Sequence, residues 1–341
     1  MRCLALCRLA AGKQRKGRKS IMDNKEWFKN AGFGMMVHFG LYSVLGGEWK
    51  GQRMRYIGEW VQSKFRIPNA EYGQLTRAFN PIYFNAEEWV LTAKAAGMKY
   101  IVVTSKHHEG FALFDSEYDN YNAVKGTPFG RDIIAELAEA CYKHGLKLGL
   151  YYSQDLDWHE ENGGGYTCDH LNSDNMSWTN DWDYPDASKK DYSRCFETKI
   201  KTQMKEILTK YGDLLLVWCD TPRTISPAQS QELYDMIKHY QPDCLVNSRI
   251  GNGLGDYRSG HDNELTMNGE TGLLCESPTT LNRTWGFKYY DDEWKSAERV
   301  KELRESLNAN GVNYLVNVGP DWLGRLPAPA VDILKKVGQM D

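Results

Sequence analysis

The chain has 341 residues, 41% of them hydrophobic and 26% charged, and its formal net charge is −3 at pH 7. This length and composition suit a globular protein with one large α/β domain, and they exclude disordered and collagen-like chains. No apolar run approaches the roughly 20 residues that span a bilayer, so we expect no membrane segment. The eight cysteines form no CxxC pair, which argues for free thiols in a reducing compartment and against structural zinc.

The N-terminal segment differs from the rest of the chain in charge. Its first twenty residues contain seven basic side chains and no acid, whereas the remaining chain is acidic overall. We expect residues 1–21 to be a basic, disordered extension and residues 22–341 to form one barrel domain. The apolar stretch CLALC is interrupted by Arg8, unlike a signal peptide, so the expected location is cytoplasmic, with secretion as the alternative. The acidic body argues against nucleic acid as a partner.

Short apolar runs alternate with amphipathic segments along this domain, which is typical of βαβ units and a parallel sheet. The sequence predicts strands at seven positions, 33–39, 100–105, 146–153, 214–220, 244–249, 272–277 and 313–319. It predicts helices at 86–97, 131–145, 196–212, 230–241 and 296–311. An eighth strand is less distinct, and its candidate position is 56–60.

The side chains at the ends of these strands favour a closed barrel over an open sheet. The strands end on reactive or polar groups, which are His38, Lys106, His107, His108, Tyr151, Ser153, Asp220, Arg249, Glu276 and Asn317. A barrel gathers such groups at one rim, whereas an open sheet concentrates its site at one switch point. No GxGxxG or Walker A turn follows a strand, so a nucleotide site is unsupported. We predict an α/β fold, a (β/α)8-like TIM barrel that is irregular, with one weak or missing strand or helix.

The predicted rim combines acids, imidazoles, a guanidinium and aromatic rings. Its members are Glu59, Asp220, Glu264, Glu276, His38, His107, His108, Arg249, Trp60, Tyr151, Trp218, Trp285 and Phe287. Aromatic rings beside hydrogen-bonding acids suit a sugar, whose apolar face stacks on a ring while its hydroxyls take polar contacts. A pair of carboxylates completes the machinery that hydrolyses a glycosidic bond.

Each rim residue also has a purely structural interpretation. His107 and His108 could be a surface pair, His38 a core histidine, Asp220 a helix N-cap and Arg249 a stabilising partner of rim acids. A catalytic metal is the chemical alternative. Barrel metallohydrolases generally carry His-x-His at the end of the first strand, whereas this chain has His-Phe-Gly from His38 onward, so we expect no metal site.

Segments spread in order over most of the chain share a further pattern. They include GMMVHFGLYS (34–43), SKHHEGFALF (105–114), LVWCD (216–220), NSRIGNG (247–253) and ESPTTLNRTWGF (276–287). Together these segments resemble the α-L-fucosidases of glycoside hydrolase family 29. The resemblance implies a retaining exo-glycosidase that removes terminal α-L-fucose from oligosaccharides or glycoconjugates through a covalent fucosyl-enzyme, without a cofactor. Its oligomeric state stays open.

The resemblance also assigns roles to individual residues. It implies Asp220 as the nucleophile. The residues implied to bind fucose are His38, Glu59, Trp60, His107, His108, Tyr151, Trp218, Arg249, Glu276, Trp285 and Phe287. The acid/base belongs to the loop after the arginine strand, whose acids are Asp256, Asp262, Glu264 and Glu270. Glu264 is the favoured acid/base, and Glu276 is the fallback. Glu276 also has a structural interpretation, as a buried, hydrogen-bonding carboxylate at a strand end that organises the rim.

Two features depart from the family pattern. Cys275 stands before Glu276 where the family usually has tryptophan, and no segment matches the C-terminal β-sandwich that many relatives carry. Two alternatives to a fucosidase remain, a barrel glycosidase for another sugar and a sugar-binding barrel without catalysis. The loops at 159–192 and 252–272 follow no pattern that predicts which linkage is cleaved.

Overall fold

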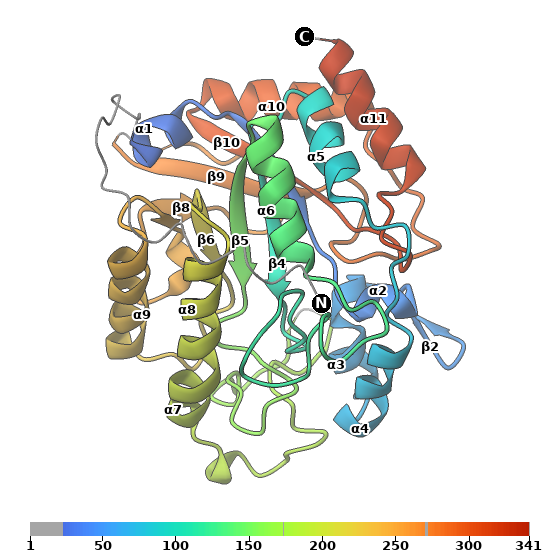
Figure 1. Ribbon diagram of the computed structural model, residues 1–341, viewed down its shortest axis with the longest axis vertical. Coiled ribbons are helices and arrows are strands. Elements are labelled where there is room, and N and C mark those ends of the chain that lie inside the picture. Colours follow the sequence, from blue (N-terminus) through green and yellow to red (C-terminus); the bar gives the residue numbers. More distant parts are fainter. Residues whose placement is uncertain (1–22, 173, 270–271, 341) are drawn as a thin grey trace, which may run out of the picture.

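The computed structural model describes residues 23–172, 174–269 and 272–340, so the predicted extension at 1–21 lies outside the described residues. Within them, eight parallel strands form a single sheet in the order β7-β6-β5-β4-β1-β10-β9-β8 (Figure 1). The strands are β1 (Phe33–Val37), β4 (Tyr100–Lys106), β5 (Lys147–Tyr152), β6 (Leu216–Cys219), β7 (Leu245–Val246), β8 (Tyr257–Ser259), β9 (Leu274–Thr280) and β10 (Val312–Val318). A single parallel bridge between Asn247 and Tyr257 links the two edges of the sheet. The sheet is therefore a nearly closed barrel with one weak seam, which confirms the predicted irregular (β/α)8 fold.

Helices cover the outside of this barrel (Figure 1). The longer ones are α5 (Ala86–Ala95), α6 (Ile133–His144), α8 (Lys201–Lys210), α9 (Pro227–Tyr240), α10 (Ala297–Ala309) and α11 (Ala328–Gln339). Their starts follow ordinary capping chemistry: the Asp132 carboxylate accepts the Ala135 N–H, and Ser226 forms a capping box with Gln229. The described residues also form the short 3-10 helices η1 (Gly58–Trp60), η2 (Gly73–Arg77), η3 (Ala187–Lys189) and η5 (Ser248–Ile250), and the π-helix η4 (Phe196–Ile200).

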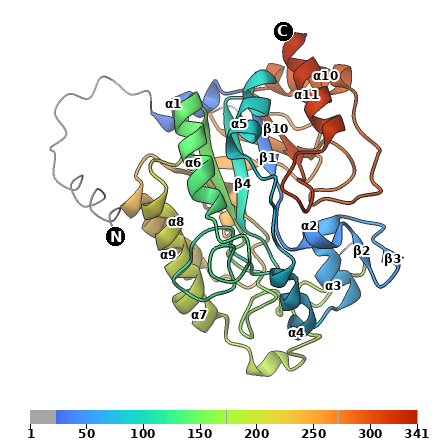
Figure 2. The same ribbon diagram turned by 45° about the vertical axis from the view of Figure 1, so that its right-hand side comes forward.

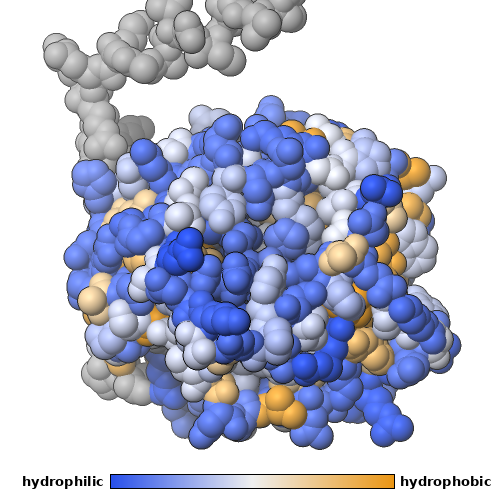
Figure 3. All heavy atoms as spheres, turned by 90° about the horizontal axis from the view of Figure 1, so that it is seen from below, coloured by the Kyte–Doolittle hydropathy of each residue, from blue (hydrophilic) through white to orange (hydrophobic). Residues whose placement is uncertain are grey.

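The carboxyl ends of the strands meet at one end of the barrel, where the longest loops gather. Short helices add to this end, namely α2 (Tyr42–Leu45), α3 (Val61–Phe65), α4 (Asn69–Tyr72) and α7 (Tyr192–Cys195). A small hairpin of β2 (Glu48–Trp49) and β3 (Gln52–Arg53) projects beside them (Figure 2). Figure 3 looks onto this end, whose surface is mostly hydrophilic with scattered hydrophobic patches.

The opposite end of the barrel is closed by α1 (Asn24–Lys29). Its Phe28 is fully buried, and its ring lies 4.9 Å from that of Tyr257 and 5.7 Å from that of Tyr100. These rings belong to the inner core of the barrel, which also contains Met36, Trp218 and Leu315. Burying a phenylalanine of this kind stabilises the fold by roughly 1.5–3 kcal/mol. The barrel is thus filled at the end where α1 lies, and open space for a ligand is left at the loop end.

The eighth strand is not where the sequence predicts it. Residues 58–60 form the 3-10 helix η1, and the missing strand is β8. Three residues with an arginine in the middle, Tyr257–Ser259, give no apolar run, so β8 cannot be recognised from hydrophobicity. The helix predicted at 230–241 begins earlier, at Pro227. None of the helices in the described part of the chain is long and apolar enough to cross a membrane.

Candidate active site

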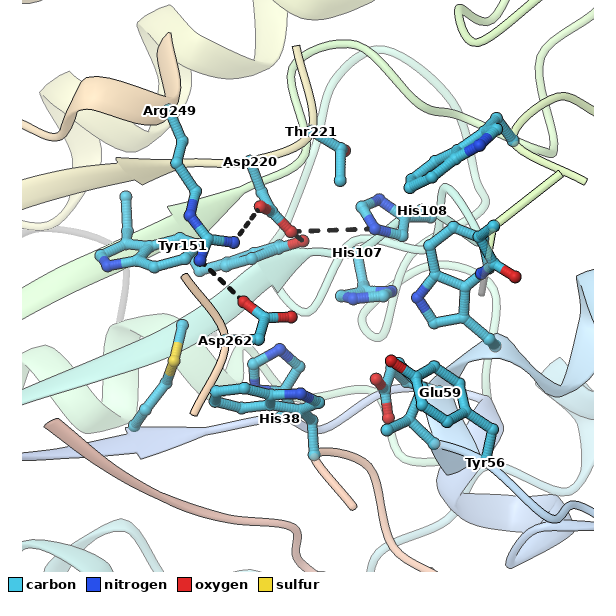
Figure 4. A pocket seen from close by; sticks show the side chains of 17 residues that line it. His38, Tyr56, Glu59, His107, His108, Tyr151, Asp220, Thr221, Arg249 and Asp262 are labelled. Atoms are coloured by element: carbon cyan, nitrogen blue, oxygen red, sulfur yellow. Dashed lines mark hydrogen bonds and ion pairs between the residues drawn. The ribbon is translucent and has the colours of Figure 1, made fainter. Parts of the chain in front are cut away.

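A cavity of about 310 Å³ opens at the loop end of the barrel (Figure 4). Ten residues predicted from the sequence line it: His38, Glu59, Trp60, His107, His108, Tyr151, Trp218, Asp220, Arg249 and Trp285. Seven more residues line it that sequence reasoning did not assign to the sugar site: Met36, Tyr56, Ile57, Asn172, Trp178, Thr221 and Asp262. The predicted Glu264, Glu276 and Phe287 are not among the lining residues.

Asp220 follows directly after β6 and receives several hydrogen bonds. The Tyr151 hydroxyl donates to its Oδ2 at 2.9 Å, and Arg249 donates from Nη1 to its Oδ1 at 2.9 Å. Burial and the nearby carboxylate raise the pKa of Tyr151 well above its usual value, so this phenol stays protonated as a donor. The His108 Nε2 lies 3.8 Å from Oδ2. The carboxylate is thereby oriented from three sides.

Arg249 joins two carboxylates at the mouth of the cavity. While Nη1 contacts Asp220, Nη2 donates to Asp262 Oδ1 at 2.7 Å and to the Gly260 carbonyl at 2.8 Å. The guanidinium also lies over the Trp218 ring, 4.7 Å from its centroid. The Asp262 side chain is 51% exposed and that of Asp220 is 12% exposed. Arg249 therefore holds one shielded and one open carboxylate on either side of a single cation, as Figure 4 shows.

Three histidines form part of the buried floor. The His38 Nδ1 lies 2.7 Å from Asn317 Oδ1, and His108 Nδ1 lies 2.7 Å from Ser153 Oγ. The His107 ring stacks on Tyr151 with centroids 5.4 Å apart, and its Nδ1 has no hydrogen-bond partner within the described residues. Burial lowers the pKa of all three rings, that of His38 to about 4. At neutral pH these rings are uncharged and can donate or accept hydrogen bonds with neutral groups.

Glu59 and Trp60 reach the floor from η1. Glu59 Oε2 accepts the Gly286 N–H at 2.7 Å, and burial raises the pKa of this carboxyl to about 8. It is therefore largely protonated at neutral pH and can itself donate a hydrogen bond. The Trp60 ring meets His108 edge to face at 5.3 Å.

Glu276 supports the floor from behind. It lies on β9, fully buried, and accepts hydrogen bonds from the Trp218 indole at 2.9 Å and from the Tyr100 hydroxyl at 2.6 Å. Burial raises its pKa to about 7. Its position behind Trp218 differs from the direct sugar contact that the sequence predicts.

Two other predicted residues also lie elsewhere. Glu264 Oε2 accepts the His261 N–H at 2.8 Å, so this carboxylate holds its own turn and not the cavity wall. Phe287 packs against Trp322, with ring centroids 5.7 Å apart, and does not line the cavity. Of the other loop acids, Asp256 pairs with Lys238 at 2.6 Å away from the cavity, and Glu270 lies outside the described residues.

The residues that the sequence did not assign to the site come mainly from loops. Asn172 and Trp178 belong to the long segment between β5 and α7, which has no periodic pattern to place it. Tyr56 and Ile57 precede η1, inside the segment that the sequence predicts as a strand. Within the part of the chain that the structure describes, no group of three or more His, Cys, Asp or Glu side chains has an arrangement that could hold a metal ion.

The chain is similar in sequence and in structure to known fucosidases. The sequence model of the family described as Alpha-L-fucosidase matches residues 8–340. The structure of the alpha-L-fucosidase AlfC from Lactobacillus casei, solved with α-L-fucose as product, is 51% identical with a TM-score of 0.89, and the match covers 93% of this chain and 98% of that one. An alpha-L-fucosidase from Vibrio sp. strain EJY3 is 35% identical with a TM-score of 0.83, over 92% of this chain and 54% of that one.

Curated sequences are more distant and longer. The plasma alpha-L-fucosidase of Homo sapiens is 29% identical over 336 residues, which cover 92% of this chain and 66% of that protein. The putative alpha-L-fucosidase of Caenorhabditis elegans is also 29% identical, over 93% of this chain and 66% of its own length. This chain thus spans about two thirds of the length of these relatives. With the family model matched from residue 8 to residue 340, the chain belongs to the alpha-L-fucosidase family of glycoside hydrolases.

Proposed function

We propose that this chain is an exo-acting α-L-fucosidase that hydrolyses terminal α-L-fucosyl linkages with retention of configuration. One observation carries the proposal: Asp220 and Asp262 bind opposite ends of one guanidinium, at the mouth of a cavity with an uncharged, hydrogen-bonding floor. Sharing one guanidinium keeps the two carboxylates close together. Retaining enzymes need about 5–5.5 Å between their carboxyl groups, against about 6.5–9.5 Å for inverting enzymes.

The floor suits the recognition of a neutral deoxy sugar. The imidazoles of His38, His107 and His108 and the protonated Glu59 can exchange hydrogen bonds with ring hydroxyls without a charge to neutralise. Trp285, whose ring lies 5.3 Å from that of His38, offers an apolar wall for the methyl group. A terminal residue bound on this closed floor leaves its aglycone at the open mouth, which is the arrangement of an exo-enzyme.

In the first chemical step, an Asp220 oxygen attacks C1 from the face opposite the leaving group. The bond between C1 and the glycosidic oxygen breaks, and Asp262, acting in its carboxylic acid form, gives its proton to that oxygen as the aglycone departs. In the second step, a water molecule attacks C1, its proton passes to Asp262, and the ester bond to Asp220 breaks. The products are α-L-fucose and the free aglycone, and both carboxyl groups return to their starting states.

Asp262 is the proposed acid/base because of its position. It lines the cavity, is half exposed to the water that the second step needs, and approaches the site from the side of the guanidinium opposite Asp220. Glu264, the acid predicted from the sequence, is turned away to its own loop. Glu276 lies behind Trp218. Neither of these side chains reaches the cavity.

A mutant form of the related AlfC was solved in complex with Fuca(1,6)GlcNAc. We propose fucosylated oligosaccharides and glycoconjugates as the substrate class of this chain, with that disaccharide as the first natural substrate to test. Release of fucose from phenyl α-L-fucoside and from the disaccharide tests the activity. We expect turnover of both these fucosides and none of the corresponding phenyl α-galactoside. Faster turnover of the galactoside would favour a glycosidase for another sugar, and fucose binding without turnover would favour a binding protein.

A further inference from the structure

The segment from Asp220 to Ile225 is held at both ends by two adjacent residues that follow β5. At one end, Gln154 Oε1 accepts the backbone N–H of Asp220 at 2.8 Å. At the other end, Asp155 Oδ2 accepts three backbone N–H groups, from Arg223 at 2.8 Å, Thr224 at 2.6 Å and Ile225 at 2.7 Å. These four hydrogen bonds leave Thr221 and Pro222 as the span between two fixed points.

Thr221, the residue after the proposed nucleophile, has a strained backbone. Its φ is +47°, the left-handed region that a β-branched side chain rarely adopts because its branched Cβ crowds the backbone there. Its Oγ1 is also buried with no hydrogen-bond partner among the described residues. Both features cost free energy in the folded state, and both occur beside Asp220, in the cavity wall shown in Figure 4.

The turn also packs against the segment that carries Arg249. A Cβ added to Gly251 would lie 2.7 Å from the Pro222 Cβ, so the turn packs directly against the backbone that follows Arg249. Gln154 strengthens this packing, because its Nε2 donates to the Arg249 carbonyl at 2.9 Å. The same glutamine therefore ties together the backbones of Asp220 and of its ion-pair partner.

Asp155 does not line the cavity, yet its carboxyl group is fully buried. Its Oδ2 serves one loop only, and its Oδ1 has no partner among the described residues. A Cβ on Gly164 would lie 1.8 Å from that Oδ1, so the neighbouring loop leaves the carboxyl no room to turn away. Burying a carboxyl group costs free energy, and this one makes its hydrogen bonds to three N–H groups of a single loop. Such an arrangement fits a role in fixing the backbone of that loop.

We propose that Asp155 is a positioning residue for Asp220, and that it acts by holding Thr221 in its left-handed conformation. This inference rests on the proposed role of Asp220 as nucleophile. Without the three hydrogen bonds, Thr221 relaxes toward negative φ and moves the Asp220 carboxylate relative to Tyr151 and Arg249. A displacement of about 1 Å at a reacting group can cost roughly 100-fold in rate. The floor that binds fucose does not touch Asp155, so ground-state binding is kept.

The first test compares Asp155→Ala and Asp155→Asn with wild-type enzyme on phenyl α-L-fucoside. We expect Asp155→Ala to lower kcat roughly 100-fold while the inhibition constant of free L-fucose stays within about three-fold. Asp155→Asn should lose less, because its amide oxygen can accept the same N–H groups. The matched control is Asp321→Ala. Asp321 is a buried carboxyl that accepts the N–H groups of Leu323 and Arg325 in a loop away from the cavity, and its loss should lower Tm without lowering kcat.

The decisive test is a double-mutant cycle with Thr221→Gly. Glycine adopts positive φ without strain, so a chain with Gly at this position needs no clamp. We expect the kcat loss caused by the Asp155 variant to be at least about ten-fold smaller in the Thr221→Gly background than in the Thr221 background. Asp155→Asn completes the same cycle if the alanine variant does not fold.

Equal kcat losses in the two backgrounds would overturn the inference, because the clamp would then not act through strain at Thr221. A rise in the fucose inhibition constant parallel to the loss of kcat would overturn it as well, since that pattern indicates general damage to the cavity. Wild-type turnover is measured first. An inactive wild-type enzyme contradicts the proposed function. An active wild-type enzyme whose Asp155 variants lose the same kcat in both Thr221 backgrounds contradicts only the role of Asp155.

Discussion

Arg249 and Asp220 form an ion pair with 2.9 Å between Nη1 and Oδ1, and this pair lines the cavity that we propose binds fucose. The pair leaves the second oxygen of Asp220 to the Tyr151 hydroxyl. Both donors orient the carboxylate without covering the cavity. This arrangement suits a nucleophile that must keep one direction of approach open.

Asp220→Gly should abolish turnover of aryl fucosides. Removal of a nucleophile that acts together with other groups costs several orders of magnitude in kcat. Azide is small enough to occupy the vacated space and attack C1, so we expect partial recovery with formation of β-fucosyl azide. The wild-type enzyme is the control, and azide should not accelerate it. A variant that keeps more than about a tenth of the wild-type rate would show that Asp220 is a structural cap.

Asp262→Ala and Glu264→Ala test the acid/base within one short loop. General acid catalysis contributes roughly 10²–10⁴-fold and matters most for a poor leaving group. Asp262→Ala should therefore lose much more activity on a fucosyl disaccharide than on 4-nitrophenyl α-L-fucoside. Glu264→Ala should leave this ratio unchanged and lower Tm, because the His261 N–H loses its acceptor. The opposite pattern would return the acid/base role to Glu264.

The buried carboxyls predict how stability depends on pH. Burial raises the pKa of Glu59 to about 8 and that of Glu276 to about 7. It also raises to about 7 the pKa of Glu109, a buried carboxyl that accepts the N–H groups of Leu41 and Tyr42. All three values lie above the usual 4.5. The folded state then binds more protons than the unfolded state between about 4.5 and 8, so the free energy of unfolding falls as pH rises. His38 has the opposite effect, because its pKa is lowered from 6.5 to about 4. The contribution of His38 to the pH dependence of the free energy of unfolding ends near pH 6.5.

Between pH 6.5 and 8 the carboxyls act alone among these four groups, and the urea midpoint should decline across that range. Glu59→Gln cannot lose a proton and should make the decline shallower, which urea unfolding curves at several pH values would measure. A midpoint that rises from pH 6.5 to 8 would contradict burial as the dominant cause of the raised Glu59 pKa.

KM for the aryl fucoside should also rise above about pH 8, because ionised Glu59 can no longer donate a hydrogen bond.

Much of the barrel could be predicted because its strands are continuous apolar runs that end on polar side chains. His38, Tyr151 and Asp220 were found in this way, since each stands at a strand end and the barrel brings those ends together. The eighth strand could not be found, because β8 is three residues long and owes its place to β9 and to the bridge at Asn247. Local sequence carries little of that information.

The acid loop shows a second limit of sequence reasoning. The family resemblance favours Glu264, whereas the cavity receives Asp262, two residues earlier. The turn is set by long-range contacts: Asn263 accepts the Thr280 N–H at 2.9 Å and adopts a φ of +57°, which directs its neighbours to different sides. Contacts between residues seventeen positions apart are decided by the packed barrel, and no local pattern reports them.

The stereochemistry of hydrolysis tests the central claim most directly. Proton NMR during hydrolysis of phenyl α-L-fucoside shows which anomer of fucose appears first, before mutarotation mixes the two. Double displacement through Asp220, with Asp262 nearby on the same guanidinium, predicts α-L-fucose as the first product. β-L-Fucose as the first product would mean a single displacement by water and would contradict the account.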